Sequence, residues 1–122
     1  MSDSSLQSRN ILLVEDEYFI ADAMQRGLEN AGAIAVGPAA SVEDALALLD
    51  SEAVDGAILD VNLDDQGVFP VAKVLTARGI PFVFATGYSA SDLPSQWRHV
   101  ARFEKPADAA TIASALFTDD AP

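Results

Sequence analysis

The sequence predicts a doubly wound α/β fold, in which a five-stranded parallel sheet carries five helices on its two faces. Short apolar segments alternate with amphipathic segments along the chain, and strands joined by helices pair in parallel through right-handed crossovers. Several apolar segments also end in polar or charged residues, as strands do where their carboxyl ends carry a site. We therefore expect five strand–helix units with one functional edge.

The size and composition of the chain fit a single domain. It has 122 residues, and 50% of them are hydrophobic, which is enough for a core. We expect a flexible tail over residues 1–9, the domain over residues 10–118 and a short tail over residues 119–122. The chain has no cysteine, signal-peptide pattern or apolar run long enough to span a membrane. These features predict a cytoplasmic protein without a membrane segment.

The chain is strongly acidic. Seven Lys and Arg residues face 19 Asp and Glu residues, for a formal charge of −12. This balance argues against a nucleic-acid-binding surface. General solubility explains part of the excess, and a cluster of acids that holds a cation is the alternative for the rest.

Each strand and helix is assigned from its apolar spacing. Strands are predicted at Ile11–Val14, Ala33–Gly37, Ala57–Val61, Pro81–Ala85 and Val100–Glu104. Helices are predicted at Glu17–Ala31, from Ser41 to about Asp50, at Val68–Arg78 and at Ala107–Phe117. Ser41 is expected to cap its helix, and Ala115 is expected on the buried stripe of the last one. Gly37-Pro38 is expected to end its strand. Pro94 interrupts Ser91–Val100, which predicts a short or irregular helix.

Charged and hydroxyl side chains lie at the ends of four of the predicted strands. Glu15 and Asp16 follow the first strand, Asp60 lies in the third, Thr86 follows the fourth and Lys105 the fifth. If the first and third strands are neighbours, their acids converge on one edge. Three clustered carboxylates repel one another without a cation, and hard oxygen ligands suit Mg²⁺. The alternative is an acidic helix start beside the helix dipole.

Asp60 is either a further metal ligand or a nucleophile. A carboxylate that attacks a phosphoryl group forms an acyl phosphate, and this chemistry depends on positioning and on neutralising the phosphoryl oxygens. A cation and the Lys105 ammonium would each neutralise one oxygen, and the Thr86 hydroxyl would bind the third. Without a role in phosphoryl binding, Thr86 would be an ordinary β-branched strand residue, and Lys105 would be an ordinary surface lysine.

Together these residues resemble the receiver domain of two-component response regulators, over roughly Asn10 to Phe117. The resemblance implies that Asp60 is the phosphoacceptor. It also implies that Asp16, Asp60 and the backbone carbonyl of Asn62 bind Mg²⁺ directly, and that Glu15 binds it through water. Thr86 would be the switch hydroxyl, and Lys105 would contact the phosphoryl group and precede a cis Pro106.

The same resemblance implies a signalling protein that is not an enzyme beyond its own phosphorylation and dephosphorylation. A histidine kinase or histidine phosphotransfer protein would supply the phosphoryl group. If no output domain follows, signalling proceeds by contact with a downstream protein, by onward phosphotransfer or by draining the kinase. We expect a monomer or a phosphorylation-dependent dimer.

The segment "FATGY" (Phe84–Tyr88) is similar to the motif of the FATGUY group of receivers, which are often stand-alone domains. Many receivers carry Tyr or Phe three residues before the lysine, and this ring swings inward on activation. This chain has Arg102 at that position, and Phe103 is expected on the other face of the strand. We hypothesise that Tyr88 replaces this ring. Trp97 is expected either as an interface anchor or in the core, and the segment around Pro94 could order on phosphorylation.

Three alternatives belong to other classes. A phosphatase of the haloacid dehalogenase type would place its nucleophile after the first strand, whereas the candidate here is on the third. A flavodoxin-like cofactor binder would place a phosphate loop where three acids stand. A degenerate receiver would serve only as an interaction module.

Overall fold

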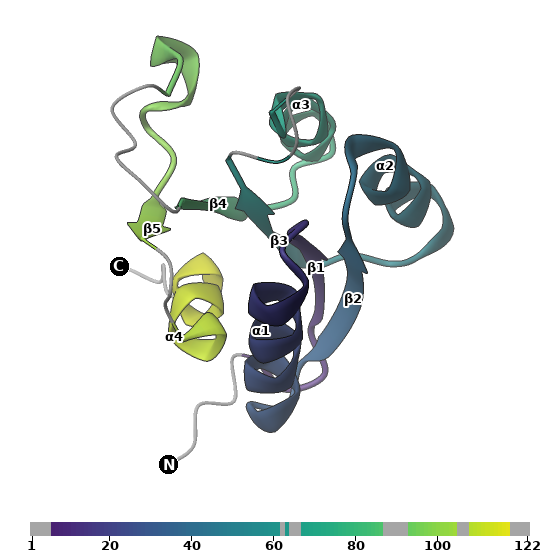
Figure 1. Ribbon diagram of the computed structural model, residues 1–122. Helices are drawn as coiled ribbons and strands as arrows, with labels where there is room; N and C mark the ends of the chain where they lie inside the picture. The colour runs from purple at the N-terminus through teal and green to yellow at the C-terminus, as the bar shows by residue number, and fades with distance from the viewer. Residues whose placement is uncertain (1–5, 62, 64–66, 87–92, 105–107, 118–122) are drawn as a thin grey trace.

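The computed structural model describes residues 6–61, 63, 67–86, 93–104 and 108–117. Within them, one sheet carries helices on both faces (Figure 1). Its strands are β1 (Asn10–Val14), β2 (Ile34–Ala39), β3 (Gly56–Asp60), β4 (Phe82–Thr86) and β5 (Arg102–Glu104). The helices are α1 (Tyr18–Asn30), α2 (Val42–Ser51), α3 (Phe69–Ala77) and α4 (Ala109–Ser114), with 3₁₀ turns η3 (Ser95–Trp97) and η4 (Ala115–Phe117).

The strand order places β1 and β3 side by side, as expected. The five parallel strands run in the order β2-β1-β3-β4-β5. Every residue of β3 is buried, as a central strand covered on both faces requires. Val14 lies opposite Leu59, so β1 and β3 end at the same edge. The predicted doubly wound sheet is confirmed.

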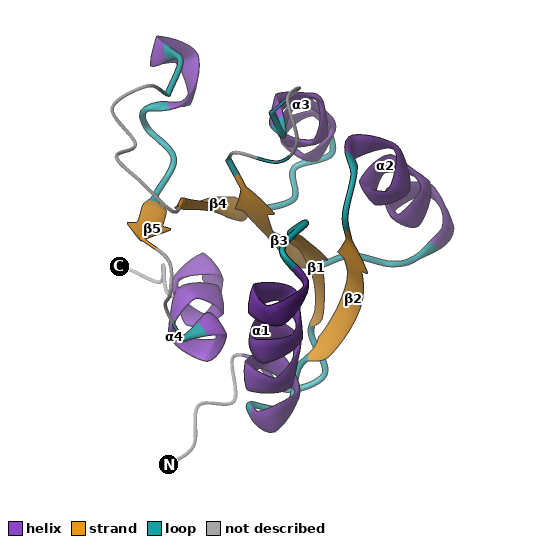
Figure 2. Cartoon of the chain, in the orientation of Figure 1, coloured by secondary structure: helices purple, strands orange, loops and turns teal. Residues whose placement is uncertain are grey.

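Two apolar cores lie on opposite faces of the sheet, and Figure 2 shows the helices divided between these faces. Side chains of α2 and α3 pack on one face with Leu12, Leu59 and Phe84. Residues of α1 and α4 pack on the other face with Leu13 and Ile58. Neighbouring residues of one strand therefore point to opposite cores, as the pleat requires.

Local sequence signals explain where the helices begin. The Ser41 hydroxyl accepts a hydrogen bond from the Asp44 backbone N–H at 3.0 Å, which satisfies one of the unpaired donors of the first turn of α2. Pro70 occupies the first turn of α3, where its missing N–H removes no helical hydrogen bond. The Ser41 cap was predicted.

The expectation that Gly37-Pro38 ends the second strand is wrong. β2 continues through this pair to Ala39, and the Gly37-Pro38 peptide bond is cis. The pairing with β1 shifts by one residue here, since Leu12 lies opposite Val36 and Val14 opposite Ala39. β2 is an edge strand, and a proline is tolerated at an edge because its missing N–H faces no neighbouring strand.

The prediction of five helices also needs correction. Within the described residues 93–104, the segment expected as a short or irregular helix contains only the 3₁₀ turn η3, so irregular is the correct description. The last predicted helix divides into α4 and η4, and Ala115 is exposed because the helical periodicity changes there. No helix in the described part of the chain is both long and apolar enough to cross a membrane.

The packed part of the chain begins before residue 10. Leu6, assigned to the flexible tail, has 1% of its surface exposed and belongs to the core beneath α1. The Ser8 N–H donates to the Gly32 carbonyl at 2.8 Å, and the Arg9 guanidinium lies 4.2 Å from the centre of the Phe117 ring. Residues 6–9 thus join the domain. The expected limit at residue 118 stays a prediction.

Candidate functional site

Three carboxylates meet where β1 and β3 end. Glu15 directly follows β1, Asp60 is the last residue of β3, and Asp16 is next along the chain from Glu15. Oxygen atoms of the three side chains all lie within 4.8 Å of one another. The pairing of β1 with β3 therefore produces the predicted convergence of acids.

Burial differs among the three side chains. Glu15 exposes 2% of its surface and Asp60 3%, whereas Asp16 is exposed. The Glu17 backbone N–H donates to a Glu15 carboxylate oxygen at 3.0 Å, which holds Glu15 against the turn leading into α1. The arrangement is a partly buried carboxylate site that is open to solvent beside Asp16.

This donor set fits a hard divalent cation. Three carboxylates so close together repel one another at neutral pH, most strongly where water is excluded. All the donors are oxygen atoms, which Mg²⁺ and Ca²⁺ prefer over nitrogen and sulfur. Among the described residues, no other group of three or more His, Cys, Asp or Glu side chains is arranged to hold an ion.

The neighbouring strand places Thr86 beside this edge. Asp60 lies opposite Ala85 in the β3–β4 pair, the Val61 N–H donates to the Ala85 carbonyl at 3.0 Å, and Thr86 is the last residue of β4. The backbone of Thr86 therefore stands one step beyond the position opposite Asp60. The side chain of Thr86 and the predicted site residues Asn62, Tyr88, Lys105 and Pro106 lie outside what the structure describes.

The alternatives for Trp97 and Arg102 are now distinguished. Trp97 exposes 6% of its surface and packs in the core with aromatic rings of α3 and β4, so the interface-anchor alternative is wrong for this conformation. Arg102 is exposed, whereas Phe103 is half-buried and packs against the core beneath α1 and α4. The prediction that these two side chains point to different faces of β5 is confirmed.

One exposed pair beside the site was missed from the sequence. Tyr18 and Phe19, the first residues of α1, expose 77% and 84% of their surfaces. Their rings meet edge to face at 5.6 Å. A signal was present, because both fall outside the apolar stripe of Met24 and Leu28 that faces the core. Large apolar side chains off that stripe indicate a contact surface.

Known proteins are similar to this chain in sequence and fold. Residues 11–116 match the response regulator receiver domain family. The sensory transduction protein LytT of Bacillus cereus is 36% identical over 81 residues, or 64% of this chain and 33% of LytT. The chain thus spans about a third of the length of this curated relative.

Solved structures show the same similarity. SdrG from Sphingomonas melonis Fr1 is 41% identical, with a TM-score of 0.78 over 92% of this chain and 98% of SdrG. A BeF3-activated conformation of SdrG has a TM-score of 0.74 over 88% of this chain and 95% of that one. A Burkholderia pseudomallei response regulator with a phosphorylated aspartic acid and a calcium ion is 25% identical, with a TM-score of 0.78 over 91% of this chain and 68% of that one. These matches decide against the phosphatase and flavodoxin-like alternatives.

Proposed function

Because this chain belongs to the response regulator receiver domain family, we propose that it is a signalling protein that accepts a phosphoryl group on Asp60. The observation that carries this proposal is the position of Asp60, which is nearly buried at the end of the central strand with Glu15 and Asp16 beside it. The similarity to the BeF3-activated form of SdrG supports control by phosphorylation.

The transfer exchanges one bond to phosphorus for another. A carboxylate oxygen of Asp60 attacks the phosphorus of a phosphohistidine, the new O–P bond forms, and the N–P bond to the donor imidazole breaks. The donor imidazole keeps the electron pair of the broken bond and takes up a proton from solvent. Hydrolysis of the acyl phosphate by water later regenerates the Asp60 carboxylate and releases phosphate.

A divalent cation, which we propose to be Mg²⁺, would supply positive charge to the phosphoryl oxygens when bound. Asp16 and Asp60 would ligate it directly, Glu15 through water, and the backbone carbonyl of Asn62 would add a further oxygen ligand. We also propose that Lys105 and Thr86 bind the remaining phosphoryl oxygens. The carboxylate cluster supports the cation site, since its oxygen donors and spacing fit this ion.

The proposed phosphodonor is a histidine kinase or a histidine phosphotransfer protein. Its histidine must reach Asp60, so its surface would cover the rim of the site, where Tyr18 and Phe19 are exposed. These rings offer apolar contact area at little entropic cost, as interface aromatics do. We propose that the downstream partner is another protein and that this chain acts in the cytoplasm. Its charge of −12 argues against binding to nucleic acid.

Intact mass after incubation with acetyl phosphate and Mg²⁺ tests the proposal. The expected result is a gain of one phosphoryl group, about 80 Da, that is lost with EDTA and in Asp60→Asn. If the parent chain gains no mass, a fluoroberyllate titration followed by the fluorescence of Trp97 separates two cases. A saturable, Mg²⁺-dependent change indicates a receiver that accepts only from its own donor. The absence of a change indicates a degenerate receiver and refutes the proposal.

A further inference from the structure

A surface hollow lies between the strand β2 and the end of α2. β2 forms one edge of the sheet, and α2 lies beside it (Figure 1). The volume of the hollow is about 380 Å³, which is enough for a large side chain or a small ligand. Ile34, Val36, Leu48 and Ala53 give it apolar walls. Ile34 exposes 51% of its surface, so a large apolar side chain is left uncovered here.

Charge distinguishes this hollow. Glu52 lines it, and no Lys, Arg or His is among its described lining residues. The exposed Glu52 side chain forms no hydrogen bond or ion pair with any residue that the structure describes. The surrounding stretch, residues 27–55, contains six Asp and Glu residues and no Lys, Arg or His. The hollow therefore lies in a negatively charged region.

Two basic residues that adjoin this region are engaged elsewhere. Arg78 is bound to the Asp50 carboxylate at 2.9 Å. The Arg9 guanidinium lies over the ring of Phe117, which packs against the core on the other face of the sheet. Neither of these cations lines the hollow. The charge of Glu52 is therefore available to a ligand.

The backbone of β2 is open beside the hollow. The Ile34 N–H donates to the Arg9 carbonyl at 2.8 Å, and the backbone groups of successive strand residues point to opposite sides. The N–H and C=O of Ala35 are therefore directed to the free edge, since β2 pairs only with β1 in the described sheet. β2 carries no charged side chain, although charges protect many edge strands from pairing. Pro38 limits pairing to the first half of β2, where the hollow lies.

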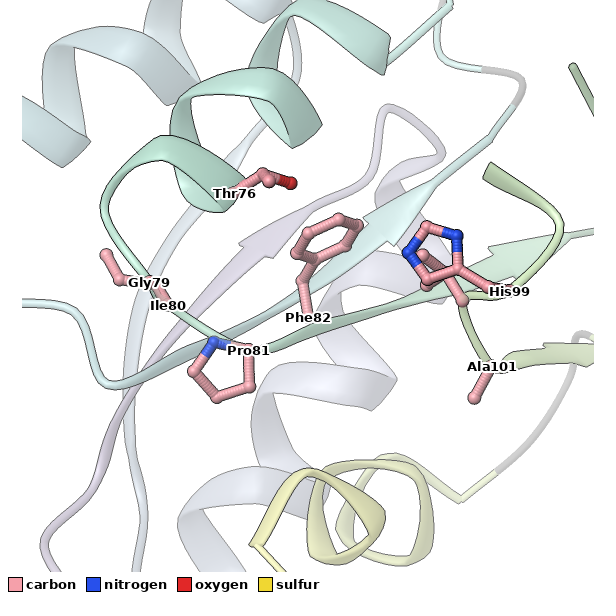
Figure 3. A pocket seen from close by; sticks show the side chains of 8 residues that line it. Thr76, Gly79, Ile80, Pro81, Phe82, His99 and Ala101 are labelled. Atoms are coloured by element: carbon pink, nitrogen blue, oxygen red, sulfur yellow. The ribbon is translucent and has the colours of Figure 1, made fainter. Parts of the chain in front are cut away.

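A second hollow, of about 420 Å³, lacks these features. It lies at the start of β4, and Figure 3 shows the Phe82 ring between the Thr76 side chain and the His99 imidazole. No Asp, Glu, Lys or Arg is among its described lining residues, so charge selects no occupant there. Of these two hollows, the one beside β2 thus combines a charge with an open strand edge.

We propose that the hollow beside β2 binds an extended, basic segment of a protein other than the phosphodonor. An apolar side chain of the segment packs on Ile34 and Leu48, a neighbouring Lys or Arg pairs with Glu52, and the backbone pairs with Ala35 as an added strand. A second copy of this chain fits less well, because an isologous contact would place the same acidic stretch opposite itself. The inference goes beyond the proposed function, since it assigns a separate partner.

The hollow is distant from the phosphorylation site. Asn10, the first residue of β1, lies opposite Ile34 and lines the hollow. Glu15 directly follows the other end of β1, and the strand between these ends is about 13 Å long. The bound segment would therefore tether this chain to its partner without blocking a donor at Asp60.

The experiment selects ligands from a phage-displayed library of random dodecapeptides, with the full chain as bait. Physiological ionic strength screens non-specific attraction between exposed charges. Selected peptides are expected to place Lys or Arg beside an apolar residue. Synthetic copies should shift the NMR amide signals of β2 and of the end of α2. Replacing the apolar residue by Ser, or the basic residues by Gln, should weaken binding by about tenfold or more.

Matched variants locate the binding site on the protein. Glu52→Lys and Ile34→Ser alter exposed residues of the hollow and should each weaken peptide binding by about tenfold. Glu43→Lys is the control, because it makes the same change of charge in the exposed first turn of the same helix and should leave binding unchanged. Circular dichroism verifies that all three variants fold.

The added strand is tested on the peptide itself. N-methylation of the peptide amide that donates to the Ala35 carbonyl should weaken binding, because it removes a hydrogen bond of the pair. Methylation of the next amide, which points away from β2, should have little effect. Equal effects at both positions would show that the segment does not pair as a strand.

Several results would overturn the inference. These are a selection that yields no peptides or peptides without basic residues, amide shifts confined to other parts of the chain, and binding that survives both substitutions in the hollow. Equal weakening in Glu43→Lys would show attraction to the acidic surface in general. A dimer of the parent chain that Ile34→Ser dissociates would identify a second copy as the occupant instead. The mass gain at Asp60 should be the same in both hollow variants as in the parent, so the proposed function and this inference fail independently.

Discussion

The Phe69 and Trp97 rings stack with their centres 6.2 Å apart and their planes 15° from parallel. Phe69 is the first residue of α3, which follows the loop after Asp60, and Trp97 ends η3. Trp97 also meets Phe82 and Phe84 of β4 edge to face. Trp97 thus packs against β4 from the segment where a short or irregular helix was predicted.

Trp97→Ala should lower the free energy of unfolding by about 3–5 kcal/mol, because it removes the centre of this aromatic cluster and leaves a cavity. Trp97→Phe keeps part of the contact and should cost less. Urea denaturation followed by circular dichroism measures both variants. A loss below about 1 kcal/mol for Trp97→Ala would show that η3 does not pack as described.

Leu6→Ala should destabilise the domain by about 2–5 kcal/mol, because Leu6 is buried under α1 despite lying near the chain start. Gln7→Ala is the matched control, since Gln7 is exposed. Thermal denaturation compares the two variants. Equal midpoints for both and for the parent chain would return residues 6–9 to the flexible tail predicted from the sequence.

Ser41→Ala should cost about 1 kcal/mol, because the first turn of α2 loses the side-chain acceptor for the Asp44 N–H. Ser41→Asp should retain most of the stability, since aspartate is an equally good cap. Ser51→Ala, at the exposed last residue of α2, is the control. A full loss in Ser41→Asp would argue that the hydroxyl has a role other than capping.

Mg²⁺ should raise the thermal midpoint in a concentration-dependent way, because the folded chain gathers three carboxylates that the unfolded chain separates. At a hundredfold excess over the dissociation constant, linkage gives about 2.7 kcal/mol. Asp60→Asn should lose most of this stabilisation. Matched ionic strength in NaCl controls for screening, and an equal rise with NaCl would exclude a specific cation site.

Replacing Tyr18 and Phe19 together by Ser should slow phosphotransfer from a phosphorylated kinase or phosphotransfer protein by about tenfold or more, because the donor loses apolar contacts beside Asp60. Phosphorylation by acetyl phosphate should not change, since this small donor needs no docking surface. Ile34→Ser, at a residue of β2 that is 51% exposed, is the control. Equal slowing with both donors would place the two rings in the reaction site itself.

The α/β fold and the grouping of Glu15, Asp16 and Asp60 could be predicted from the amino-acid sequence alone. Apolar runs identify strands because burial on both faces leaves no place for polar side chains. In a parallel doubly wound sheet, the carboxyl ends of neighbouring strands meet at one edge. Once the first and third strands were neighbours, the acids had to converge, and the structure places them within 4.8 Å. The Ser41 cap was also predictable, because its hydrogen-bond partner Asp44 lies only three residues away.

Features that depend on contacts between residues distant in sequence could not be predicted in this way. Leu6 reads as part of a polar tail and becomes core only because α1 and its neighbours form a place for it. Gly37-Pro38 reads as a strand end, and the edge position of β2 lets the strand continue. Trp97 was equally suited to a surface or a core until α3 and β4 brought Phe69 and Phe82 to it. Local patterns specify elements because hydrogen bonding and periodicity are local, whereas burial depends on what the rest of the chain places opposite each side chain.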